Sequence, residues 1–153
     1  MVRMGEMLEY TYVNGNAYGT TKKSVEEARA RGKNVILDVD TIGAMKIRAL
    51  CPDATLIYIL PPSWDELKSR LSSTGIYTEE EVNALMEIAE EEISCANNYD
   101  YILVNDTISN TLSRFAQIIH SNRYSRNCMK EFLDSYIDGE VKPHVQSYKE
   151  ALL

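Results

Sequence analysis

The stretch Thr55-Leu56-Ile57-Tyr58-Ile59-Leu60-Pro61-Pro62-Ser63 joins an apolar run to a helix start, and it indicates the kind of fold this chain adopts. The run Thr55–Leu60 has the length of a strand and is rich in apolar residues, as in a strand that is buried on both faces. Ser63 followed by Glu66 is typical of a helix N-terminus, so we expect a helix over Ser63–Leu71. A buried strand followed directly by a helix is the building unit of α/β proteins.

Two more apolar runs, Asn34–Val39 and Tyr101–Val104, have the same character and are also followed by helix signals. Thr78 and Glu81 repeat the capping pattern, and apolar residues then recur every three or four positions, which predicts a long helix. Three buried strands alternating with helices predict an α/β fold with a parallel sheet. The other predicted helices are Ser24–Arg31, Ile108–Ile119 and Met129–Ile137.

The chain has 153 residues and a formal net charge of −7. This length suits one ordinary domain, which we place at residues 1–120, with residues 121–153 as a C-terminal extension whose structure is unknown apart from the short predicted helix at Met129–Ile137. The acidic balance offers no cationic surface for nucleic acid or for an anionic bilayer. No apolar run reaches the roughly 18 residues that a membrane span needs, and no signal-peptide pattern is present, so we expect a cytoplasmic protein.

The three cysteines, Cys51, Cys95 and Cys128, are widely spaced and contain no C-x-x-C pair. This pattern predicts reduced thiols rather than a disulfide framework or a zinc site.

Candidate ligand-binding residues gather upstream, in the Tyr-rich stretch Glu9–Thr20 and in Asp38-Val39-Asp40. A carboxylate can accept two adjacent donors at once, such as the N1–H and the exocyclic amino group of guanine. Hydroxyl groups can complete the contacts to a base or donate to a phosphate without adding charge. Gly15 and Gly19 fit tight turns that could display such side chains. Taken one by one, these side chains could equally be exposed polar residues of a strand or a strand end.

In this order and at this spacing, the residues resemble the monophosphate site of the guanylate kinases. The resemblance extends from about Glu6 to His120. It implies a P-loop nucleoside-monophosphate-kinase-like parallel sheet with flanking helices. The other matching motifs are Asp38-Val39-Asp40 with Gly43, Leu60-Pro61-Pro62-Ser63, Tyr99-Asp100-Tyr101 and Val104-Asn105-Asp106.

The resemblance also implies roles in binding GMP. Glu9 matches the carboxylate that reads guanine, Tyr18 the tyrosine that binds the phosphate, Thr20 the small hydroxyl near the base, and Asp40 a second carboxylate that contacts the base. Asn105 falls where the family contacts the adenine of the phosphate donor, although an asparagine after a strand is also an ordinary turn residue. No residue is assigned a catalytic or a metal-binding role.

Several parts that phosphoryl transfer requires are missing from these 153 residues. The phosphate loop reads G-x-x-x-x-G-K-[ST], whereas Gly32-Lys33 lacks the other required residues and fits a helix end. Thr74 and Leu85 fall where the two lid arginines of the family would lie. Loss of one such arginine can cost about 10³- to 10⁵-fold in rate, so we expect no measurable guanylate kinase turnover. The remaining cations are predicted to be helix-surface charges, namely Lys22, Lys23, Lys46, Arg48, Lys68 and Arg70.

The leading interpretation is a truncated guanylate kinase homologue that lacks the phosphate-loop strand and keeps a residual GMP pocket. It resembles the shortened homologues carried by some poxviruses, and a viral protein of this kind would work in the host cytoplasm. A missing strand would leave backbone groups of its neighbours unpaired. We therefore expect that Asn34–Val39 pairs differently, or that the C-terminal extension, a second copy or a protein partner covers the gap.

Three alternatives stay open. A partner could supply the phosphate loop, giving an active split kinase that binds Mg-ATP. The chain could instead be a protein-interaction module on a guanylate-kinase-like fold, as in membrane-associated scaffold proteins, with a phosphorylated peptide in the old monophosphate pocket. Such recognition normally depends on arginine, which this acidic chain does not favour. The third alternative is a decaying gene product without a ligand.

Overall fold

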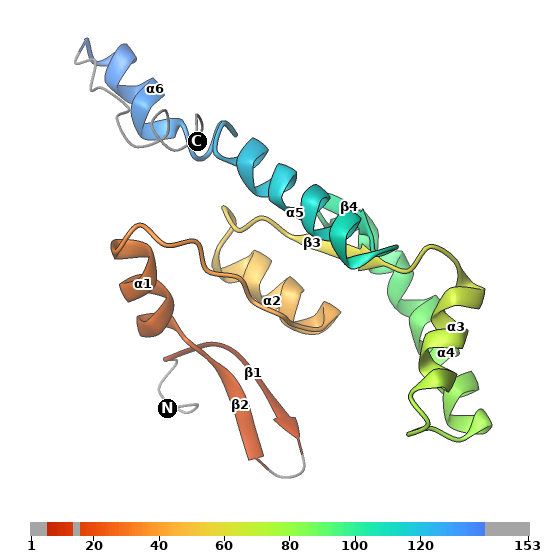
Figure 1. Cartoon of the computed structure of the whole chain (residues 1–153). Coiled ribbons are helices and arrows are strands. Elements are labelled where there is room, and N and C mark those ends of the chain that lie inside the picture. The colour runs from red at the N-terminus through yellow and green to blue at the C-terminus, as the bar shows by residue number, and fades with distance from the viewer. Residues whose placement is uncertain (1–5, 14–15, 140–153) are drawn as a thin grey trace. The chain divides into compact units, whose positions relative to one another are not determined.

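The computed structural model describes residues 6–13 and 16–139, and the chain forms two compact units, residues 1–56 and residues 57–153 (Figure 1). Each unit has its own strands and helices. The predicted domain boundary at residue 120 lies inside helix α5 and stays a prediction. In the described part of the chain, no helix is long and apolar enough to cross a bilayer.

The first unit begins with an antiparallel hairpin made of β1 (Met7–Val13) and β2 (Asn16–Thr21). Met7 pairs with Thr21 and Glu9 pairs with Thr20, which leaves Leu8 as an extra residue in β1. An extra residue of this kind is a β-bulge, which changes the direction in which nearby side chains point. Leu8 itself is buried.

Gly19 lies within β2 and not at a tight turn, so that prediction was wrong. A Cβ atom at Gly19 would overlap the carbonyl oxygen of Glu9 and lie 2.7 Å from the Cα of Tyr10. Glycine is therefore needed here because the backbones of the two strands approach closely. Gly15, the other predicted turn residue, lies outside the described residues.

Two helices complete the first unit: α1 (Lys22–Ala30) and α2 (Thr41–Leu50). The side chain of Thr21 caps α1, and Gly32 follows its end with a φ of 71°, as a glycine at a helix C-terminus should. Helix α2 packs against β1. The core of this unit consists of Leu8, Ala44, Ile47 and Leu56.

The predicted strand Asn34–Val39 does not form: among the described residues, residues 33–40 belong to no helix or strand. A strand is stable only when a neighbouring strand satisfies its backbone N–H and C=O groups. The two described sheets contain only β1 with β2 and β3 with β4, so this run joins neither ladder. Ile36 is 66% exposed, whereas a strand buried on both faces would hide it.

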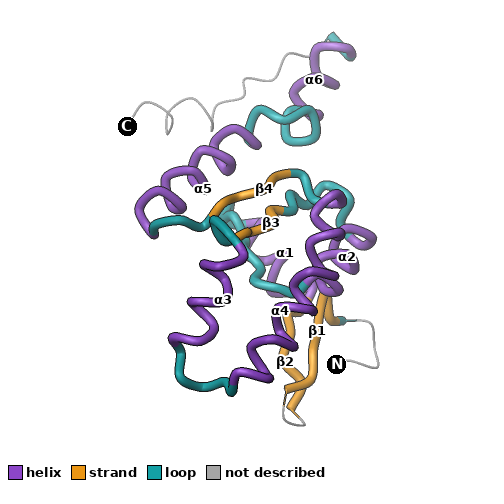
Figure 2. The backbone as a smooth tube through the Cα atoms, turned by 90° about the vertical axis from the view of Figure 1, so that its right-hand side faces the viewer, coloured by secondary structure: helices purple, strands orange, loops and turns teal. Residues whose placement is uncertain are grey.

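The second unit is built on two parallel strands, β3 (Ile57–Leu60) and β4 (Tyr101–Val104), which confirms two of the three predicted strands (Figure 2). Ile57 pairs with Tyr101 and Leu60 with Val104. The connection between the strands contains α3 (Trp64–Ser73), α4 (Glu79–Ile93) and a 3₁₀ helix (Ser94–Asn98). After β4 come α5 (Ile108–Asn122), which packs against β4, and α6 (Lys130–Ile137).

The starts of α3 and α4 are where capping predicts them. The Ser63 side chain accepts from the backbone N–H of Glu66 at the start of α3. At the start of α4, Thr78 and Glu81 each accept a hydrogen bond from the other's backbone, which is a complete capping box. The buried residues Val82, Ala96 and Leu103 form the apolar core.

Candidate functional site

The hairpin brings two of the predicted GMP-binding residues together. Glu9 and Thr20 are paired across β1 and β2, and directly opposite residues of an antiparallel pair share one face of the sheet. Both residues are half-buried. Tyr18 lies two residues before Thr20 and pairs with Thr11, but its side chain is outside the described part of the structure.

Asp40 is held at the start of α2, because its Oδ1 accepts the backbone N–H of Gly43 at 2.6 Å. The carboxylate thus caps the helix, a role that aspartate commonly has. Asp40 is nevertheless exposed. Only its Oδ1 takes part in the capping bond, and the carboxylate has a second oxygen, Oδ2. The predicted role as a base-contacting residue therefore has to be shared with helix capping.

Glu9 and Asp40 approach each other at Gly43, the third residue of α2. A Cβ atom on Gly43 would lie 3.1 Å from Asp40 Oδ1 and 3.3 Å from Glu9 Cγ. The Glu9 and Asp40 side chains therefore flank one buried glycine, although the two residues are 31 positions apart in the sequence. Carboxylates on neighbouring side chains can offer several acceptor oxygens to a ligand with adjacent N–H donors.

One contact near this site was not predicted from the sequence. The Nζ of Lys46 on α2 lies 5.8 Å from the ring centroid of Tyr10 on β1, which is within the range of a cation–π interaction. It ties the hairpin to the same helix that carries Gly43. Little in the sequence indicates this contact, because a tyrosine in a strand or a lysine in a helix does not show which residue it will meet.

Asn105 belongs to the second unit, where it follows β4. Its backbone N–H donates to Leu60 O at 2.7 Å, and its side-chain Oδ1 accepts from the hydroxyl of Thr111 at 3.1 Å. Its carbonyl oxygen accepts from a terminal guanidinium nitrogen of Arg70 at 3.0 Å. These bonds support the ordinary turn role of Asn105, and the adenine-binding role stays a prediction.

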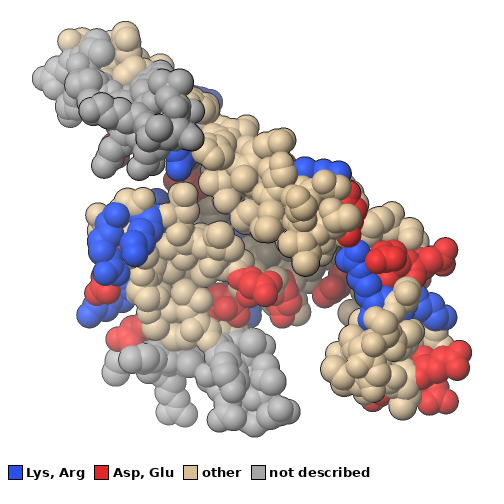
Figure 3. Space-filling model, viewed as in Figure 1, with Lys and Arg blue, Asp and Glu red and all other residues tan. Residues whose placement is uncertain are grey.

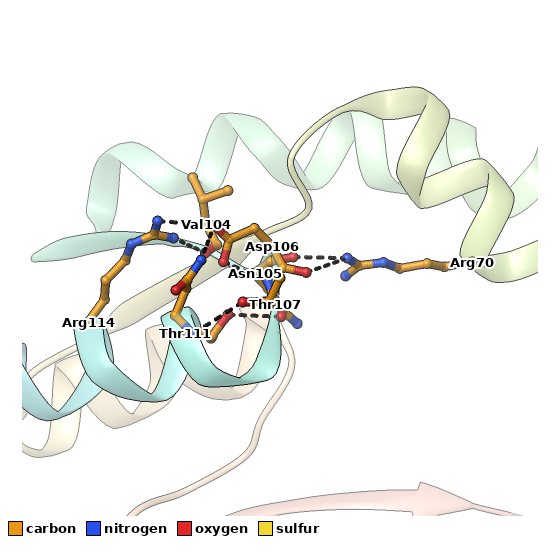
Figure 4. Close-up of polar contacts among 8 residues, drawn as sticks. Arg70, Val104, Asn105, Asp106, Thr107, Thr111 and Arg114 are labelled. Carbon is orange, nitrogen blue, oxygen red and sulfur yellow. Dashed lines mark hydrogen bonds and ion pairs between the residues drawn. The ribbon is translucent and has the colours of Figure 1, made fainter.

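Arg70 is not only a surface charge of α3, as its sequence position suggested. Its Nε donates to Glu66 Oε1 at 2.7 Å. Its terminal nitrogen also donates to the backbone carbonyls of Asn105 and Asp106, as Figure 4 shows. Arg70 can make these bonds because the tertiary fold places the end of β4 next to α3. The guanidinium therefore joins α3 to the turn after β4.

Arg114 on α5 reaches the same turn. It donates to Val104 O at 3.1 Å and to Asp106 Oδ2 at 3.0 Å (Figure 4). The backbone N–H of Thr107, followed by hydrogen bonds from Arg114 and Asn110, holds the pKa of Asp106 below its usual value. Sequence reasoning missed this pair, because the spacing of Asp106 and Arg114 is not that of neighbours on one helix face.

A shallow hollow of about 780 Å³ lies beside β4 and α5 in the second unit. Its lining combines mostly apolar residues of β4 with mainly polar residues of α5. Asp106 and Arg114 contribute to it and already pair with each other. The full lining is Pro62, Tyr101, Ile102, Leu103, Val104, Asp106, Arg114, Gln117, Ile118 and Ser121.

The positions of the expected lid arginines carry no positive charge. Thr74 caps the end of α3, where its hydroxyl donates to Leu71 O at 2.8 Å, and Leu85 is a half-buried residue of α4. Helix α4 contains seven glutamates and no lysine or arginine. Figure 3 shows acidic atoms together with some Lys and Arg atoms over α3 and α4, and further Lys and Arg atoms over α1. Within residues 6–13 and 16–139, no cluster of acidic, histidine or cysteine side chains could hold a metal ion.

Comparison with known proteins decides the family. The model of the family described as guanylate kinase matches residues 1–122. The chain belongs to the guanylate kinase family. The match covers the first unit and residues 57–122 of the second, and therefore includes Glu9, Thr20 and Asp40 as well as Asn105.

Individual guanylate kinases agree with this assignment. The guanylate kinase of Clostridium acetobutylicum is 40% identical over 142 residues, which are 92% of this chain and 66% of that protein. That of Francisella tularensis is 44% identical over 116 residues, which are 75% of this chain and 61% of that protein. The chain thus spans less than two thirds of the length of these relatives.

A solved structure shows that the likeness extends to the fold. The crystal structure of guanylate kinase from Anaplasma phagocytophilum has a TM-score of 0.64 and 30% identity, covering 81% of this chain and 60% of that chain. The chain therefore has a guanylate-kinase-like α/β fold.

Proposed function

We propose that this guanylate kinase homologue binds GMP through the hairpin and the start of α2, and that these 153 residues alone do not transfer a phosphoryl group. The observation that carries the proposal is the approach of Glu9 and Asp40 at Gly43. Guanine presents adjacent N1–H and amino donors, which a single carboxylate can accept together. Glu9 accepts this pair in the proposal, and the second oxygen of Asp40 and the hydroxyl of Thr20 complete the contacts to the base.

Tyr18 completes the proposed pocket at the phosphate end. A phenol hydroxyl can donate to a phosphate oxygen without bringing a charge. Without guanidinium groups around the phosphate, this contact is weak compared with a bidentate arginine–phosphate pair. The proposal therefore expects modest affinity for GMP, with most of the specificity from the base.

Two features support the absence of phosphoryl transfer. The 153 residues contain no G-x-x-x-x-G-K-[ST] loop to hold the donor phosphates, and in the proposal they lack the strand that precedes such a loop. The acidic helix α4 would also repel a nucleotide triphosphate, and Arg70 already bonds to Glu66 and to backbone carbonyls. The similarity to shortened poxvirus homologues stays a prediction.

Calorimetric titration of the purified chain with GMP tests the proposal. Glu9→Gln keeps the shape of the side chain but replaces one acceptor oxygen by a donor, so it should weaken GMP binding about 10-fold or more. Tyr18→Phe should weaken binding less, because it removes one neutral hydrogen bond. Glu26→Gln, on the exposed side of α1, is the matched control and should bind GMP as the natural chain does.

The catalytic half of the proposal needs a separate assay. ADP formation from ATP, Mg²⁺ and GMP should not exceed that of a blank without protein. Turnover that depends on GMP would contradict the proposal. Absence of any GMP binding by the folded chain, even at millimolar GMP, would contradict the binding half.

A split kinase is the second candidate, and exposed apolar residues on the small sheet favour it. Ile59 on β3 is 54% exposed and Ile102 on β4 is 56% exposed, which is unusual for short parallel strands. A partner or second copy that packs against the faces of this sheet would cover them, and a partner with a phosphate loop would also bring Mg-ATP. Copurification of a protein with that loop, together with ADP formation by the mixture, would support this candidate. A monomer that recruits no such protein would count against it.

A further inference from the structure

We propose that Gly43 is a positioning residue for guanine recognition, because only a residue without a side chain leaves Glu9 and Asp40 room on either side of the first turn of α2. The inference rests on the proposed binding of GMP. It assigns to a buried glycine the task of aiming the carboxylate that reads the base. It also predicts that discrimination between bases depends on a residue that makes no contact with the nucleotide through a side chain.

The first step of the argument is steric. Gly43 is buried, and a Cβ atom added to it would meet Asp40 Oδ1 at 3.1 Å, Val39 Cβ at 3.2 Å and Glu9 Cγ at 3.3 Å. All three distances are shorter than ordinary van der Waals contact between such atoms. The added methyl group therefore has to displace at least one of these side chains.

The second step identifies the side chain that moves. Asp40 is held by the 2.6 Å hydrogen bond from the Gly43 backbone N–H and caps the helix. The contacting atom of Val39 is its Cβ, which the backbone holds in place, so side-chain rotation cannot move it away. Glu9 has more rotatable bonds, and its contacting atom is Cγ. Rotation about χ1 moves Cγ away from residue 43 at small cost, and the carboxylate moves with it. Glu9 is therefore the group that a methyl at residue 43 displaces.

The third step separates this role from a general effect on folding. In an ordinary helix interior, replacing glycine by alanine stabilises the helix by about 1 kcal/mol. Gly43 has a helical conformation and no positive φ, so alanine is compatible with its backbone. A loss of base recognition in Gly43→Ala without a comparable loss of thermal stability would thus identify positioning as the cause.

The decisive measurement compares GMP with inosine monophosphate, which lacks the exocyclic amino group. For the natural chain, both contacts of Glu9 form with GMP and only one forms with inosine monophosphate. In Gly43→Ala we expect GMP binding to weaken about 10- to 100-fold and the preference for GMP over inosine monophosphate to fall. Ala49→Val, which adds bulk to the exposed side of α2, should leave the preference unchanged. An unchanged preference in Gly43→Ala would overturn the inference.

A structural measurement on the unmodified chain covers the case in which Gly43→Ala does not fold. A nuclear Overhauser contact between the γ protons of Glu9 and the α protons of Gly43 should be present without ligand, and its absence would overturn the inference. If the contact is present but GMP does not bind, the proposed function fails, and the assigned role in base recognition fails with it. If GMP binds but the contact is absent, only the role of Gly43 fails.

Discussion

Arg70 on α3 and Asn105 after β4 are 35 residues apart in sequence, yet a guanidinium nitrogen of Arg70 lies 3.0 Å from the carbonyl oxygen of Asn105. This bond joins the connection between the two strands to the end of the second strand. The same guanidinium also bonds to Glu66 on its own helix, so one side chain holds α3 to the turn after β4. The contribution of the Arg70 side chain to the free energy of unfolding can be measured by substitution.

Arg70→Ala should lower the free energy of unfolding by about 1–2 kcal/mol, because it removes charge-assisted hydrogen bonds to partly buried carbonyls. A loss of that size corresponds to a decrease in Tm of about 3–8 °C in a protein of this size. Thermal unfolding followed by circular dichroism measures it. Lys68→Ala, at an exposed position of the same helix, should change stability by less than about 0.5 kcal/mol. Equal effects of the two substitutions would show that the Arg70 contacts carry no net stability.

The lowered pKa of Asp106 predicts a pH dependence with a defined sign. A carboxyl group whose folded pKa is below its unfolded value contributes stability above the unfolded pKa of about 3.9, and this contribution is lost as the pH falls through the folded pKa. The stability difference between the natural chain and Asp106→Asn should therefore shrink as the pH is lowered through this range in urea unfolding. A difference that stays constant with pH would contradict the assignment.

The same site allows a more direct test of its charge partner. Arg114 donates a hydrogen bond to Asp106 and contributes to lowering its pKa, after the backbone N–H of Thr107. In Arg114→Ala, the Asp106 pKa measured by NMR titration should therefore rise relative to the natural chain. It should still stay below its ordinary value, because the hydrogen bond from Thr107 remains.

Arg114 also covers part of the outer edge of β4. Since the N–H of Asn105 donates to Leu60 O, the adjacent carbonyl of Val104 points away from β3, and Arg114 donates to it. Exposed strand edges promote association between copies. Sedimentation velocity should therefore show more self-association for Arg114→Ala than for Arg126→Ala, an exposed control on the turn after α5. Equal sedimentation of the two variants would rule out this protective role.

Two leucines of the second unit provide a matched comparison of burial. Leu103 is 2% exposed and Leu112 is 61% exposed. Leu103→Ala should cost about 2–5 kcal/mol, because it leaves a cavity in the core, whereas Leu112→Ala should cost less than about 0.5 kcal/mol. Urea unfolding measures both. A large effect at Leu112 would show that this position is covered in solution, for example by a second copy.

Local patterns predicted the starts of α3 and α4 well because capping depends on residues three positions apart, whereas no helix was predicted at α2. Ser63 and Thr78 accept the expected hydrogen bonds, and α3 and α4 begin directly after them. The strands β3 and β4 were also predicted, since an apolar run bounded by Pro61 or by Asn105 leaves few other choices. Such features can be read from sequence because the partner atoms lie in the same short segment.

Predictions failed where the partner lies far along the chain. Asn34–Val39 has strand composition but joins neither described ladder, because composition does not supply a neighbouring backbone. Gly19 resembled a turn residue, and only the pairing with β1 shows that it allows close contact between strands. Arg70 resembled a surface charge, and only the position of the turn after β4 reveals its bonds.

The sequence by itself determined the family of this protein, the residue types of its candidate guanine site and the capped starts of α3 and α4, because each depends on identity and short spacing. The tertiary structure alone decided that Glu9 and Asp40 meet across Gly43, and that Arg70 and Arg114 reach the turn after β4. These contacts arise when β1 packs on α2 and when α3 and α5 lie beside the end of β4. Packing of this kind depends on the whole core, so no local pattern encodes it.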